Sequence, residues 1–351
     1  MREAPETSRP GGRALRQAEI TALPGPADFV RFAPGFAPRF VVTVDTEEEF
    51  DWNSPFARAE HSLDSIPRLA KFQQFCEGFG VAPVYLIDYP VATDPRTVEA
   101  VGAAVAQGNA DIGVQLHPWV NPPLDEEVTA RNSFAGNLPP ELERAKFGKL
   151  REAIERGFGA TPRIYRAGRY GVGPATAAML AEAGIAIDSS VRASFDYSAE
   201  GGPNFRDHPL APWWVGGRAK TGRRLIELPL TTVYWGMLRR QGRWLHPALW
   251  RAPRLRGLLA RLGLLERIPL TPEGVAAEEA LKAIDVALDD GLPLLVFSFH
   301  SPSLLPGHTP YVRDEDDLDR LYAWWRACFD HLARRGVKPA SVGEIIEAAK
   351  I

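Results

Sequence analysis

Short β-branched segments alternate with segments of helical periodicity along this chain, and this alternation restricts the fold more than any other feature. Residues 40–44 form a continuous apolar run of the kind expected for a buried parallel strand. Further strand candidates occur at residues 84–87, 111–116, 164–166, 185–187, 225–229 and 294–299. Helical segments are predicted at residues 62–78, 94–106, 139–157, 174–183, 271–290 and 318–335. About seven strand–helix units favour a closed parallel α/β barrel over an open doubly wound sheet.

The chain of 351 residues is long enough for two domains, but α/β barrels of this length commonly form one. We predict a barrel domain over residues 37–351, preceded by a flexible segment, residues 1–36, that is rich in Arg, Glu, Pro and Gly. No glycine-rich phosphate fingerprint follows the first strand, which argues against a dinucleotide-binding fold. Residues 192–224 are predicted to be a long loop that walls a cleft.

The charge balance excludes several classes of partner. The formal net charge is −3, which gives no reason to expect binding to nucleic acid or to an anionic membrane. The N-terminal residues lack a secretory apolar region, and no apolar run approaches the length of a membrane span. We therefore expect a cytoplasmic protein. Cys76 and Cys328 are predicted to be buried free thiols, and the sequence says nothing of oligomeric state.

Ionisable side chains follow four of the predicted strands, where α/β barrels build their active sites. Asp45 and Glu47 follow the first strand, and extended backbone would point both to one side. One carboxylate could then hold a metal while the other accepts a proton from water. An exposed acidic loop is the alternative explanation.

The other three strand ends carry His117, Arg166 and His300. His117 and Asn121 lie four residues apart and could face one point, although a single histidine after a strand is often only a surface or core residue. Arg166 begins an arginine- and glycine-containing loop that suits an anion or the orientation of a carboxylate, or else a simple salt bridge. His300 ends the most apolar strand, either as a tuned catalytic group or as a satisfied core histidine.

Taken in order, these motifs resemble the polysaccharide deacetylases (the NodB-homology, carbohydrate esterase family 4 type), and more closely their divergent WalW-like branch. The resemblance extends from about residue 40 to the C-terminus. It rests on four segments: Thr43-Val44-Asp45-Thr46-Glu47-Glu48, His117-Pro118-Trp119-Val120-Asn121-Pro122, Tyr165-Arg166-Ala167-Gly168-Arg169-Tyr170-Gly171 and Phe299-His300-Ser301-Pro302. It implies a distorted (β/α)7 TIM-like barrel.

The resemblance also implies roles for individual residues. Asp45 matches the catalytic base, Arg166 the arginine that orients this base, and His300 the acid that protonates the leaving amine. Residues matching the ligands of a divalent metal, with Zn²⁺ as the expected ion, are Glu47, His117 and Asn121. Tyr170, through a nearby backbone N–H, and Trp119 are assigned to the oxyanion and the substrate. Asp188 matches a supporting partner.

Two positions depart from the family pattern. The second metal histidine is Asn121 in this chain, and an amide oxygen is a poorer Zn²⁺ ligand than imidazole. Gly168 and Arg169 stand where the third motif usually has a proline pair. With these departures, the resemblance still implies a metal-dependent hydrolase that removes N-acetyl or related acyl groups from a carbohydrate.

Two alternatives stay open. One is a sugar-binding barrel without a metal, with Trp119, Trp213, Trp214 and Trp235 as platforms for sugar rings. The other is a hydrolase of a non-sugar amide.

Overall fold

A single curled sheet organises the computed structural model, which describes residues 19–51, 54–59, 61–216, 224–249 and 252–349. Its parallel strands follow the order β10-β1-β2-β3-β4-β5-β7, with antiparallel β6 beyond β7 and β11 paired with the start of β1. The strands are β1 (Arg39–Thr46), β2 (Val84–Ile87), β3 (Asp111–Leu116), β4 (Ile164–Ala167), β5 (Ile187–Asp188), β6 (Trp213–Trp214), β7 (Ile226–Glu227), β10 (Leu294–His300) and β11 (Lys338–Pro339).

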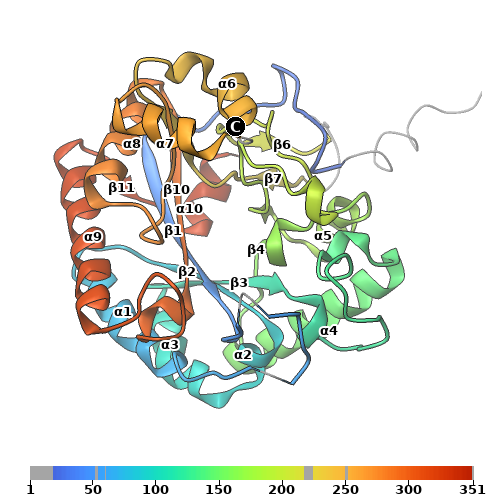
Figure 1. The fold of residues 1–351 in the computed structure, drawn as a ribbon. Helices are drawn as coiled ribbons and strands as arrows, with labels where there is room; N and C mark the ends of the chain where they lie inside the picture. Colours follow the sequence, from blue (N-terminus) through green and yellow to red (C-terminus); the bar gives the residue numbers. More distant parts are fainter. Residues whose placement is uncertain (1–18, 52–53, 60, 217–223, 250–251, 350–351) are drawn as a thin grey trace, which may run out of the picture.

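The sheet curls towards closure, as predicted for a distorted (β/α)7 barrel (Figure 1). A separate two-stranded sheet, β8 (Thr232–Trp235) and β9 (Glu266–Pro269), is flanked by residues that contact β10. Thr231 N donates to Val296 O at 3.2 Å, and Ser298 N donates to Leu270 O at 3.2 Å. These bonds join the chain that follows β7 to the edge strand β10, so the barrel is bridged on this side by isolated contacts in place of a strand ladder.

Helices lie outside the curled sheet (Figure 1). They are α1 (Leu69–Glu77), α2 (Tyr89–Thr93), α3 (Pro95–Gln107), α4 (Pro140–Phe158), α5 (Thr176–Ala183), α6 (Gly242–Ala248), α7 (Pro253–Arg261), α8 (Ala277–Asp289), α9 (Glu315–Arg334) and α10 (Val342–Ala348). Asp94 caps α3 by accepting from Arg96 N at 2.9 Å, and Pro95 occupies the first turn of this helix, which the sequence predicted at residues 94–106. The helix predicted from residue 271 begins only at Ala277, because Glu273 turns back towards β10.

Part of the segment that was predicted to be flexible contacts the barrel. Residues 1–18 lie outside the described residues, but residues 19–36 pack against the barrel. Ile20 and Val30 are buried, Phe29 forms a bridge with Trp213, and Ala33 N donates to Ala348 O at 2.9 Å. Apolar residues of this stretch thus anchor it to the barrel.

The sequence also led to expectations about the two cysteines and about membrane-spanning segments. Cys76 and Cys328 are buried free cysteines, as predicted. Among the helices of the described residues, none combines the length and the apolar character that crossing a bilayer requires.

Candidate active site

The carboxyl ends of four parallel strands bring the predicted residues together. Asp45 is in β1, His117 follows β3, Arg166 is in β4 and His300 ends β10. Asp45 and His300 are register partners across the β1–β10 pair, and Gln115 and Arg166 are partners across β3–β4. Since all of these strands run parallel, their side chains meet at one end of the barrel.

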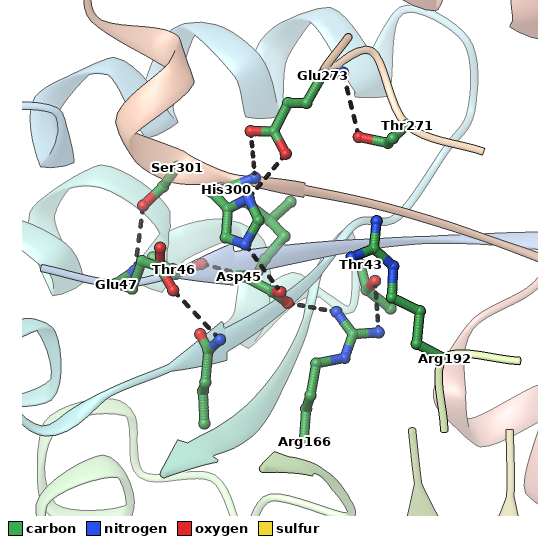
Figure 2. Close-up of polar contacts among 12 residues, drawn as sticks. Thr43, Asp45, Thr46, Glu47, Arg166, Arg192, Thr271, Glu273, His300 and Ser301 are labelled. Carbon is green, nitrogen blue, oxygen red and sulfur yellow. Dashed lines mark hydrogen bonds and ion pairs between the residues drawn. The ribbon is translucent and has the colours of Figure 1, made fainter. Parts of the chain in front are cut away.

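Asp45 is held between two cations at this end (Figure 2). Arg166 Nη1 donates to Asp45 Oδ1, and His300 Nε2 lies 3.7 Å from Asp45 Oδ2. Arg166 is fully buried and is fixed by bonds from Nε to Ser189 O at 2.9 Å and from Nη2 to Thr43 Oγ1 at 2.9 Å. A buried arginine held in this way fixes the carboxylate in one orientation.

His300 is paired with a carboxylate that the sequence did not point to (Figure 2). Glu273 Oε2 lies 2.7 Å from His300 Nδ1, while Glu273 Oε1 accepts from His300 N at 3.1 Å and from Ser303 Oγ at 2.6 Å. Burial lowers the pKa of His300, but the negative charges of Glu273, Glu47 and Asp45 outweigh it and raise the pKa to about 10. The imidazole is therefore protonated at neutral pH and can act as an acid.

His117 lies between two glutamates. Its Nδ1 is 2.8 Å from Glu48 Oε2, and its Nε2 is 3.4 Å from Glu47 Oε2. Trp119 stacks on the imidazole with ring centroids 4.4 Å apart. On Gly168, a Cβ atom would come within 2.3 Å of the His117 ring, so a glycine at this position makes room for the histidine.

The pair formed by Glu47 and His117 fits a divalent cation. If Nδ1 carries the proton that bonds to Glu48, the Nε2 lone pair points towards the Glu47 carboxylate, and two electron-pair donors face each other. Two tetrahedral ligands bonded at about 2.0–2.2 Å lie about 3.3–3.6 Å apart, which matches the observed 3.4 Å separation. Burial is the main cause that raises the pKa of Glu47 to about 7, and a cation would reverse this effect.

Behind His117, two more carboxylates are buried, and among the described residues neither has an arginine or a lysine as its ionic partner. Glu48 and Asp88 are inaccessible to solvent, and together with His117 they place possible ligand atoms within 4.8 Å of one another. Glu48 Oε1 has no hydrogen-bond partner within the described structure. Burial raises the pKa of Glu48 to about 8 and that of Asp88 well above its usual range. This side of the site thus carries an excess of potential negative charge.

Asn121 makes structural contacts. Its Nδ2 donates to Lys146 O at 2.9 Å and to Pro122 O at 2.7 Å, while Lys146 Nζ donates to Asn121 O at 2.6 Å. Asn121 Oδ1 is buried and has no hydrogen-bond partner among the described residues. These bonds join the loop after β3 to α4, and a role for Asn121 as a metal ligand stays a prediction.

A cavity of about 310 Å³ opens above these groups. Glu47, His117 and His300 are on its surface, whereas Asp45 is only 2% exposed and lies beneath. Its remaining lining is largely aromatic and hydroxylic, with Phe50, Phe56, Trp119, Tyr170, Tyr197, Tyr311, Thr231, Thr271 and Ser298 among the residues. Such a lining suits a ligand that has both apolar faces and hydroxyl groups.

Tyr170 reaches this cavity through an unusual backbone turn. Arg169 and Tyr170 have φ values of 53° and 62°, in the left-handed region that residues with side chains rarely adopt. Arg169 is paired with Glu200 and lies 4.2 Å over the Phe134 ring, which offsets the strain. The predicted oxyanion role of the Tyr170 backbone stays a prediction.

The suggested tryptophan platforms are only partly located at the cavity. Trp119 lines it. Trp213 and Trp214 form β6 and are buried in the core, and Trp235 packs beneath Lys282 at 4.5 Å. None of these three tryptophans is among the residues that line the cavity, and for Trp213 and Trp214 burial in the core favours packing over contact with a sugar.

Four functional candidates were missed by sequence reasoning: Glu48, Asp88, Gln115 and Glu273. Asp88 directly follows β2, so the strand-end rule used for the others would have found it. Gln115, whose Nε2 donates to Glu47 Oε2 at 3.4 Å, is in β3 itself. No sequence pattern indicated a role for Glu273, because its partner His300 is 27 residues away, beyond helix α8.

Comparisons with known proteins give structural matches alone. No family model matches the chain, and a search of curated proteins finds no relative. A protein from Mycobacterium smegmatis assigned as a polysaccharide deacetylase matches with 18% identity and a TM-score of 0.49, over 93% of this chain and 94% of that one. The Bc1960 peptidoglycan N-acetylglucosamine deacetylase matches with 11% identity and a TM-score of 0.43, over 90% and 92% of the two chains.

A third match is BA3943 from Bacillus anthracis, described as a CE4 family pseudoenzyme. It shares 9% identity and a TM-score of 0.40, over 93% of this chain and 71% of that one. The matched structures thus include the deacetylase family that the motifs resemble, and the WalW-like branch stays a prediction. At this level of similarity, neither the activity of the enzymes nor its loss in the pseudoenzyme transfers to this chain.

Proposed function

We propose that this protein is a metal-dependent hydrolase that removes an N-acetyl or related acyl group from a carbohydrate. The observation that carries the proposal is the arrangement around Asp45, which lies between Arg166 and His300. On the adjacent cavity wall, Glu47 and His117 are spaced as a pair of metal ligands. A base, an acid and a cation site around one cavity are the groups that amide hydrolysis requires.

Glu47 and His117 would hold the metal, with Glu48 orienting the His117 ring through Nδ1. A bound divalent cation would polarise the acyl carbonyl and lower the pKa of a water molecule. Asp45 would accept the proton of the attacking water, with Arg166 keeping its other oxygen in place. His300, protonated because of Glu273, would donate a proton from Nε2 to the departing amine.

A metal-titrated deacetylation screen tests this proposal. Chelator-treated protein is supplied with Zn²⁺, Co²⁺ or Mn²⁺, and acetate release is measured from N-acetylated oligosaccharides and from N-acetylated amino acids. We expect metal-dependent release from the sugars, reduced by about 10²–10⁴-fold in Asp45→Asn, which removes the base. Asp330→Asn, on the exposed face of α9, is the matched control and should leave the rate unchanged.

Each other outcome excludes part of the proposal. Release from N-acetylated amino acids alone would favour the non-sugar amide hydrolase. Sugar binding without metal uptake or acetate release would favour the non-catalytic sugar-binding barrel.

A further inference from the structure

Arg192 is a basic residue of the cavity to which the reaction described above gives no role. It follows β5 in the chain and forms an isolated bridge with Leu230. Its side chain is partly exposed and lines the same cavity as Glu47, Glu273 and His300. Figure 2 draws it beside the polar cluster of Thr43, Arg166 and His300. A group bound at the cavity can therefore reach this guanidinium.

Aromatic rings fix the position of the Arg192 guanidinium. It lies 3.9 Å from the centroid of the Phe195 ring and 5.4 Å from that of Tyr170. Its Nη1 donates to Tyr197 Oη at 3.2 Å. A guanidinium has five N–H donors, and within the described structure this is the hydrogen bond that its side chain makes. The side chain is thus held in place, yet most of its hydrogen-bonding capacity is unused.

The other cations around the cavity are each matched by a carboxylate. Arg166 pairs with Asp45, His300 with Glu273, and Arg169 with Glu200. Among the described residues, no carboxylate oxygen lies within 4 Å of the Arg192 nitrogens. Glu273 acts on Arg192 electrostatically, but its oxygens already accept from His300 and Ser303. Arg192 is therefore the cation whose charge the nearby protein leaves unmatched.

We propose that Arg192 binds a negatively charged oxygen group of the substrate, so that the substrate is an acidic N-acylated sugar. A planar guanidinium can donate two hydrogen bonds to the oxygens of a carboxylate or of a phosphate, so either group could supply the negative charge. That the substrate is an acylated sugar rests on the proposed function. That it carries a negative charge rests on Arg192 alone. The competing explanation is that Arg192 only anchors its loop by stacking on Phe195.

Three sugars that share one N-acetyl group separate these explanations. They are N-acetylglucosamine, its C6-oxidised uronic acid and its 6-phosphate, which differ in a neutral, carboxylate or phosphate group. Binding is measured by calorimetry in the presence of chelator, where the proposed hydrolysis does not proceed. We expect the wild-type protein to bind at least one acidic sugar about tenfold or more tightly than the neutral one. Whichever acid is preferred identifies the source of the charge.

Substitutions then assign the preference to Arg192. Arg192→Gln should remove it, by weakening the acidic sugar about tenfold and leaving the neutral sugar nearly unchanged, and Arg192→Lys should retain part of it. Arg169→Gln is the matched control, because this arginine lines the same cavity but already has a carboxylate partner, and it should keep the preference. Circular dichroism and thermal unfolding verify that each variant is folded.

Two results would overturn the inference: equal binding of the three sugars by the wild-type protein, or an unchanged preference in Arg192→Gln. Failure of the proposed function looks different. In that case none of the three sugars releases acetate when metal is restored, whereas the binding preference and its loss in Arg192→Gln persist.

Discussion

The two halves of the site solve the problem of buried charge in opposite ways. In one half, Asp45 is matched by Arg166, and His300 by Glu273. In the other half, Glu47, Glu48 and Asp88 surround His117, with no arginine or lysine among the ionic partners that the described residues give them. In the first half, each buried charge has a partner of opposite charge within the protein. The second half gathers carboxylates that burial pushes towards their protonated forms.

This difference assigns a task to each half. Matched charges hold fixed geometry without any ligand, as a base and an acid require. Unmatched carboxylates around a histidine lower their free energy by taking up either protons or a metal ion. The contrast therefore predicts that substitutions on the two sides change stability in opposite directions when metal is absent.

The largest effect is expected from breaking the matched half. Arg166→Met leaves Asp45 buried without its partner, and we expect it to lower the free energy of unfolding by about 3–5 kcal/mol. Arg144→Met is the matched control, because its ion pair with Glu182 is on the surface and contributes at most about 1 kcal/mol. Urea unfolding of both variants measures the difference. Equal losses in the two variants would contradict the role given to Arg166.

A smaller effect is expected on the pH dependence of activity. His300 must be protonated to act as an acid, so activity should fall as pH rises through its pKa, which the charge of Glu273 raises above the usual value. Since the Glu273 charge raises this pKa, Glu273→Gln should move the alkaline limb of kcat/KM to lower pH, towards the usual value near 6.5. Glu99→Gln, an exposed residue of α3, serves as the control. An alkaline limb that stays in place in Glu273→Gln would show that His300 is not the acid.

The smallest effect is expected in the unmatched half, where a substitution should raise the free energy of unfolding of the metal-free protein. The pKa of Glu48 is raised by burial to about 8, so its charged form destabilises the metal-free fold; the penalty is absent below about pH 4.5 and complete above about pH 8. Glu48→Gln should therefore stabilise the metal-free protein at pH 8, by about 1 kcal/mol or more. Saturating Zn²⁺ should remove this advantage. Thermal unfolding with and without chelator tests both statements, and destabilisation in chelator would mean that Glu48 is already balanced.

The sequence predicted the strand-end residues well because their placement follows from topology alone. Parallel strands align their carboxyl ends, so the sequence alone predicts Asp45, His117, Arg166 and His300 at one end of the barrel. The packing of residues 19–36 against the barrel was not predicted, because the sequence alone does not show which surface their apolar side chains contact. Glu273 was placed in a helix because Thr271 and Pro272 resemble a helix start, and its bond to His300 depends on a turn without a local signature.

The sequence also could not predict which charged side chains face the site. Glu48 and Glu49 are adjacent in an acidic run, yet Glu48 faces His117, whereas Glu49 accepts bonds from Ser62, Asp64 and Ser65 in the loop that leads to α1. Which glutamate faces the site is set by how the chain leaves β1. Asn121 could be read as a ligand from spacing alone, and only its bonds to Lys146 and Pro122 reveal a second task.

Zinc binding tests the account most directly, because the unmatched half is explained here as a cation site. Protein stripped of metal is titrated calorimetrically with Zn²⁺, beside the His117→Ala and Asn121→Ala variants. We predict one Zn²⁺ per wild-type chain and an affinity at least about 10–100-fold weaker in His117→Ala. Asn121→Ala shows whether this residue contributes to binding or only to stability. Absence of Zn²⁺ binding in the folded wild-type protein, or an affinity unaffected by His117→Ala, would contradict the account.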